Sequence, residues 1–109
     1  LSLLMMIVAS HVFAEIQIHS QFKGVLGPEL QNIQDRFNLI LSEQPTPYTD
    51  EIIRQFYQQS QEQILHALQP FGYFKPKIKS TLMSKGQEYW LTYQIDPGPL
   101  LRIHSLKIE

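Results

Sequence analysis

The pattern of apolar and polar residues has a period of two near both ends of the chain and a helical period between them. Residues 15–22 place apolar side chains on one face and polar ones on the other: Ile16, Ile18 and Phe22 against Gln17, His19 and Gln21. Alternation of this kind predicts a half-buried strand, the first of the domain.

Two amphipathic helices are predicted after this strand. The first runs from about Pro28 to Ser42, with Gly27 as its cap and an apolar stripe of Leu30, Ile33, Phe37, Ile40 and Leu41. The second begins between Pro47 and Asp50, capped by either Thr46 or Thr49. Its stripe is Ile53, Phe56, Tyr57, Ile64, Ala67 and Leu68. Ser60 interrupts that stripe, and we expect a neighbouring helix to come close there.

The second helix is predicted to end in a reversal that leads to two more strands. Pro70 disfavours continuation of the helix, and Gly72 can adopt the left-handed conformation that reverses the chain. Residues 74–82 then alternate, with Phe74, Ile78 and Leu82 on one face and Lys75, Lys77 and Lys79 on the other. A hairpin turn is expected over 83–87, around Gly86. The third strand, 88–95, places Tyr89, Leu91, Tyr93 and Ile95 on one face and Trp90, Thr92 and Gln94 on the other.

The resulting order is β-α-α-β-β, an α+β domain with a helix pair on one face of a three-stranded sheet. Residues 96–99, Asp-Pro-Gly-Pro, break the third strand. A further alternating run, 100–109, has no place in this minimal core. We therefore expect the sequence to be a fragment, with residues 15–98 forming one domain and residues 99–109 beginning the next.

Composition narrows the classes of function. The chain has 109 residues, 43% of them hydrophobic, and a formal net charge of −1, which fits one compact domain. A near-neutral balance does not predict the basic face that nucleic-acid binding needs. The absence of cysteine excludes disulfides, cysteine metal sites and thiol nucleophiles.

The first residues, 1–14, are predicted to be a signal peptide. Residues 1–10 are apolar apart from two serines and too short to span a bilayer, which takes about 20 residues. The small residues that follow suit a signal peptidase, so we place the cleavage between Ala14 and Glu15. A buried first element of the domain is the alternative.

No arrangement of residues predicts catalysis, a metal site or a cofactor. The histidines His11, His19, His66 and His104 have no ligand spacing, and no phosphate loop, dinucleotide fingerprint or nucleophile motif occurs. The Gly24–Gly27 spacing resembles the GxxG loop of some RNA-binding domains, but that loop joins two helices, whereas here it joins a strand to a helix.

The predicted second strand is the main candidate for binding. Lys75, Lys77 and Lys79 on one face, together with Pro76, are typical of an exposed sheet edge that resists aggregation. The same edge, including Ile78, could accept a strand from a partner. Trp90, on the polar face of the third strand, is either an anchor for a partner or a packing residue.

With these motifs in order, the chain resembles a POTRA domain of the Omp85 superfamily. The residues that carry the resemblance are Gly72-Tyr73-Phe74 after the second helix, the hairpin, and Pro97-Gly98-Pro99 before a new strand. The run 22–33, which includes Gly24 and Asn32, is similar to the first POTRA domain of TamA-type translocation and assembly proteins. We take Gly24, Asn32, Gly72, Tyr73 and Gly98 as the fold-defining residues.

The resemblance implies a two-layer fold, with two antiparallel helices on one face of a mixed three-stranded sheet. It implies a periplasmic scaffold in a Gram-negative bacterium that helps autotransporters and other barrel proteins insert into the outer membrane. The implied partners are a TamB-like protein anchored in the inner membrane, unfolded outer-membrane clients, following POTRA domains and the chain's own carboxy-terminal barrel. The longer second helix and the two-proline connector leave open a BamA-type, two-partner-secretion or barrel-less septum protein.

Overall fold

The computed structural model describes residues 15–100, and within them the predicted β-α-α-β-β order is confirmed. The elements are β1 (Gln17–Lys23), α2 (Gly27–Ser42), α3 (Asp50–Leu68), the short 3-10 helix η1 (Gln69–Phe71), β2 (Lys77–Lys85) and β3 (Glu88–Asp96). Ala14 and all but the first residue of the strand predicted for 100–109 lie outside the described residues.

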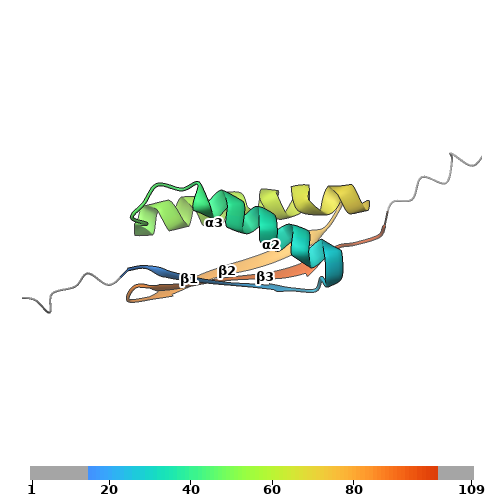
Figure 1. The fold of residues 1–109 in the computed structure, drawn as a ribbon. Helices are drawn as coiled ribbons and strands as arrows, with labels where there is room; N and C mark the ends of the chain where they lie inside the picture. Colours follow the sequence, from blue (N-terminus) through green and yellow to red (C-terminus); the bar gives the residue numbers. More distant parts are fainter. Residues whose placement is uncertain (1–14, 101–109) are drawn as a thin grey trace, which may run out of the picture.

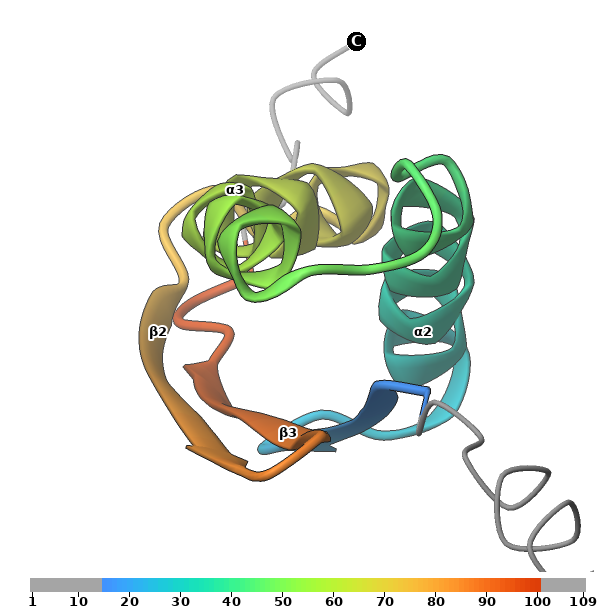
Figure 2. The same cartoon turned by 90° about the vertical axis from the view of Figure 1, so that its left-hand side faces the viewer.

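The three strands form one mixed sheet in the order β1-β3-β2. β3 is central, parallel to β1 and antiparallel to β2. Both helices cover the same face of this sheet and run in opposite senses, while no helix of residues 15–100 lies on the other face (Figure 1). Seen end-on, the helices form one layer and the curved sheet the other (Figure 2). The α+β two-layer fold is thus as predicted.

The core lies between these layers and uses the predicted faces. The four inward residues of β3 are buried, and α2 contributes Ile33 and Phe37. Aromatic rings join the layers: Phe37 meets Phe22, Phe56 and Tyr93 with ring centroids 4.9–5.8 Å apart. The periodicity of each segment therefore identified the buried side before any tertiary contact was known.

Ser60 is buried in the core, where its hydroxyl is hydrogen-bonded both within α3 and to the sheet. Its hydroxyl lies 2.6 Å from the hydroxyl of Tyr93, a sheet residue, and donates to the carbonyl of Tyr57 at 2.6 Å. The polar residue that interrupts the apolar stripe of α3 thus forms a hydrogen bond between the helix layer and the sheet. The close approach of a neighbouring helix at Ser60 stays a prediction.

The ends of the elements also differ in places from the prediction. Thr49 caps α3, since its side chain accepts from the backbone N–H of Ile52. The cap of α2 is Leu26, without a side-chain hydrogen bond, so Gly27 is the first helical residue and was wrongly predicted as the cap.

β2 is shifted towards the hairpin by three residues relative to the predicted strand 74–82. Phe74 is 52% exposed and lies before the strand, where the bend at Lys75 and Pro76 delays sheet pairing. The strand then continues to Lys85, so the turn is the two residues Gly86 and Gln87 and not all of 83–87. A positive φ at Gly86 alone is the pattern of a type II′ turn, which matches the twist of the strands it joins.

Candidate interaction surface along the β2 edge

β2 forms one edge of the sheet, and within residues 15–100 it pairs only with β3. The Gln17 N–H donates to the Gln87 carbonyl at 2.8 Å, so the backbone of Gln87 points at β1. Because backbone groups alternate in direction along a strand, those of Glu88 and its pair Lys85 point at one another. Alternate residues back along β2 therefore direct their backbone groups to the outer edge: Ile78, Ser80, Leu82 and Ser84.

The side chains of β2 divide between the two faces of the sheet. Ile78, Ser80 and Leu82 are half-buried on the helix side, whereas Lys77, Lys79, Thr81, Met83 and Lys85 are exposed on the open face. Of the predicted edge residues, Lys77, Ile78 and Lys79 lie on β2. Lys75 was wrongly included in the strand, since it lies in the bend before it. Lys85 was missed as an edge residue because the predicted strand ended at Leu82.

On the helix side, α3 borders this edge through polar contacts. The hydroxyl of Tyr57 lies 2.9 Å from the Ser80 hydroxyl, and the side-chain amide of Gln61 donates to the same oxygen. The Ser80 side chain is thereby tied to α3, while its backbone groups remain directed outwards. The α3 side of the edge is thus held in place by hydrogen bonds as well as by packing.

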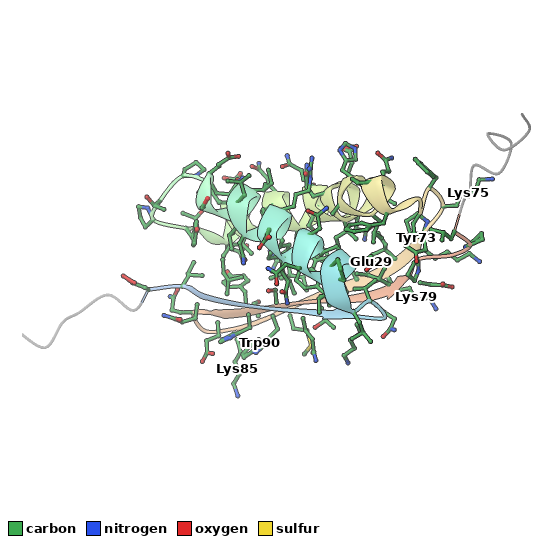
Figure 3. All side chains as sticks on the ribbon, turned by 45° about the vertical axis from the view of Figure 1, so that its right-hand side comes forward. Glu29, Tyr73, Lys75, Lys79, Lys85 and Trp90 are labelled. Carbon is green, nitrogen blue, oxygen red and sulfur yellow. The ribbon has the colours of Figure 1, made fainter. Side chains whose placement is uncertain are left out.

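Trp90 lies on the open face of the sheet, pointing away from the helices as Lys85 does (Figure 3). It is 36% exposed and stacks on the His19 ring, with centroids 5.4 Å apart and planes at 19°. Met83, 66% exposed, is its cross-strand partner on β2. His19, Trp90 and Met83 therefore form a row across all three strands, which we name the open-face row.

The acidic neighbours of the β2 lysines have other hydrogen-bond partners. Glu88, opposite Lys85, bonds to the His19 ring at 2.9 Å, and Asp96, opposite Lys77, accepts from the Gly98 N–H at 3.1 Å. Within residues 15–100, Arg54 and Asp50 form an ion pair at 2.8 Å, while the contact between His19 and Glu88 is a hydrogen bond. None of the lysines along β2 is in an ion pair with another described residue.

The residues taken as fold-defining gather mainly at the end of the sheet where β3 ends. A Cβ on Gly24 would lie 1.9 Å from the Ile95 carbonyl oxygen, and one on Gly98 would lie 2.9 Å from that of Lys75. Tyr73 is half-buried there, lining a hollow of about 280 Å³ beside Glu29 (Figure 3).

The remaining two residues tie down the end of α3. Asn32 donates from its side chain to the Ala67 carbonyl at 2.7 Å, and Gly72 adopts a left-handed conformation after η1. Because the last carbonyls of a helix lack partners within it, the Asn32 amide satisfies one of them from the neighbouring helix.

Two further observations concern the described part of the chain. Over residues 15–100, neither α2 nor α3 combines the length and the hydropathy that a membrane-spanning helix requires. In the same range no group of three or more histidine and carboxylate side chains is placed to hold a metal ion.

Comparison with known proteins points to one family. A family model described as POTRA domain, TamA domain 1, matches residues 20–97, which is more than half of the chain. None of the curated proteins matches the chain. Among the described elements, the matched range begins within β1, includes α2, α3, β2 and β3 in full, and ends one residue after β3.

Proposed function

Because the chain belongs to the POTRA family, with a domain of the kind that comes first in TamA, we propose that it is a periplasmic protein-interaction scaffold of an outer-membrane barrel protein. The observation that carries this proposal is the outer edge of β2. Its backbone groups at Ile78, Ser80, Leu82 and Ser84 have no strand beside them in the described residues. Main-chain hydrogen bonds of this kind let an incoming segment extend a sheet with little demand on its sequence.

A scaffold of this kind suits clients that arrive unfolded. Barrel proteins before insertion are chains of extended segments, and an open sheet edge offers them temporary pairing. We propose as partners the carboxy-terminal domain of a TamB-like protein, unfolded outer-membrane clients, following POTRA domains and a carboxy-terminal barrel. Trp90 would anchor a partner that also reaches the open face, since an aromatic side chain there gives a large contact area at small entropic cost.

The proposal is tested by titrating the labelled chain with a TamB carboxy-terminal domain and following backbone amide resonances. We expect shifts concentrated between Lys77 and Lys85. No binding at about 1 mM partner, or shifts confined to the helices, would contradict the proposal.

The variant Ile78→Pro should weaken this binding at least tenfold. Proline removes the N–H that Ile78 directs to the outer edge, while leaving the alternate N–H groups that pair with β3. Ile78→Ala is the matched control, because it removes the same half-buried side chain but keeps the N–H. If both variants bind equally well, the outer edge of β2 is not the site of pairing.

A further inference from the structure

Charge is distributed unevenly over the two layers, although the net charge is only −1. The segment 74–85 contains no acidic residue and presents the exposed lysines Lys75, Lys77, Lys79 and Lys85. The helices carry most of the acidic residues of the described chain: Glu29, Asp35, Asp50, Glu51 and Glu62, against Arg36 and Arg54. The β2 edge is therefore a basic strip beside an acidic helix layer, a polarity that the total charge conceals.

Protection against aggregation does not account for this strip by itself. The sheet has a second edge, β1, which has the half-buried apolar residues Ile18 and Phe22 and one charged residue, Lys23, at its end. If lysines served only to guard exposed edges, β1 would need them as much as β2. Edge protection alone therefore leaves the concentration of lysines on β2 unexplained.

We propose that the β2 edge selects an extended segment with carboxylates at alternate positions, an inference that rests on the proposed function of this edge. Lys77, Lys79 and Lys85 share the open face, so one face of an added strand would run beside all three. Side chains directly opposite on neighbouring strands lie about 5 Å apart, which brings a carboxylate within reach of a lysine ammonium.

The lysines of β2 are available for such a partner because none of them is in an ion pair with another described residue. Glu88 is bonded to His19, and Asp96 accepts from the Gly98 N–H. The other side chains of the added strand would face Ile78 and Leu82, so apolar residues fit there. The acidic helices would repel a carboxylate-rich segment that approached the helix layer, and the attraction to β2 would thus also set its orientation.

The probe for this proposal is a blocked octapeptide of alternating glutamate and valine, which presents all its carboxylates on one face whichever way it runs. Its comparison peptides replace every glutamate by glutamine or by lysine. We expect the glutamate peptide to shift the amides of Lys77–Lys85 and to bind about tenfold more tightly than the glutamine peptide, with the lysine peptide weakest. The difference in affinity between the glutamate and glutamine peptides should disappear at about 1 M salt, where surface charges are screened.

The variant Lys77→Gln/Lys79→Gln should reduce the affinity for the glutamate peptide about fivefold, since Lys85 remains, and leave the affinity for the glutamine peptide unchanged. Lys23→Gln, which removes an exposed lysine from the other edge, is the matched control and should change neither. Equal binding of the glutamate and glutamine peptides at β2 would overturn the selectivity while leaving edge pairing in place. Absence of β2 shifts with every peptide would overturn edge pairing itself and the selectivity with it.

Discussion

The hydroxyl of Ser60 lies 2.6 Å from that of Tyr93, inside an otherwise apolar core. Since Ser60 donates its single proton to the Tyr57 carbonyl, the Tyr93 hydroxyl donates to Ser60. Burial raises the pKa of Tyr93, which keeps this hydroxyl protonated as a donor. The pair joins the second helix to the central strand at a point that neither segment identifies alone.

This pair predicts unequal effects of its two deletions on stability. Ser60→Ala leaves the Tyr93 hydroxyl buried without a partner and should lower the free energy of unfolding by about 1–3 kcal/mol. Tyr93→Phe leaves Ser60 bonded to Tyr57 and should cost about 1 kcal/mol. Urea unfolding measures both, and the double variant should cost less than the sum of the two. Strict additivity would mean that the hydroxyls do not interact.

Gly24 is predicted to be much harder to replace than Gly86. Its φ is +96°, and a Cβ there would lie 1.9 Å from the Ile95 carbonyl oxygen. Gly24→Ala should therefore lower the free energy of unfolding by about 2–4 kcal/mol, because strain and backbone clash add. Gly86→Ala is the control, with a φ that is also positive, at +62°, but nothing within 4 Å of the added Cβ, and should cost about 1 kcal/mol. Equal losses on thermal or urea unfolding would remove the role given to the Ile95 contact.

The side-chain amide of Asn32 should contribute to the stability of the domain. The substitution Asn32→Asp keeps the shape of the side chain but replaces the donor to the Ala67 carbonyl by a second acceptor. We expect a loss of about 1–3 kcal/mol in unfolding free energy. Asn38→Asp makes the same change at an exposed position of the same helix and should cost less than about 0.5 kcal/mol.

Asp50 should make the stability of the domain depend on acid pH. The hydrogen bond from Tyr89 at 2.6 Å, and then that from Arg54, hold the pKa of Asp50 below its ordinary value of 3.8. Its contribution is therefore present above 3.8 and is lost as the pH falls through the lowered value. Asp50→Asn should be less stable than the parent chain near neutral pH, and the difference should shrink on acidification.

Urea unfolding between about pH 7 and about pH 2 checks this dependence. Glu51→Gln, which removes the same charge from the same first turn of α3, controls for the interaction with the helix dipole. If Asp50→Asn and Glu51→Gln respond to pH in the same way, the Tyr89 contact contributes nothing specific.

The sequence by itself determined the order of the elements and which face of each is buried. Apolar residues recur every second position in a strand and every three to four in a helix, so the buried face of β3 and the apolar stripes of both helices follow from local spacing. Turn chemistry is equally local, which is why the reversal at Gly72 and the turn at Gly86 were predictable. The pairing of strands is not a local property. The start and end of β2 were therefore misplaced, although the alternation of its apolar and polar residues was clear.

Only the tertiary structure decided that β3 is the central strand and that β1 forms the second edge. Strand order depends on which strands pair after the two helices have carried the chain from β1 to β2. The spacing of apolar residues within one segment contains no information about that pairing. The same holds for the bond between Ser60 and Tyr93, for the open-face row, and for the separation of a basic edge from acidic helices. These features arise where distant segments come together, and the proposals about binding rest on them.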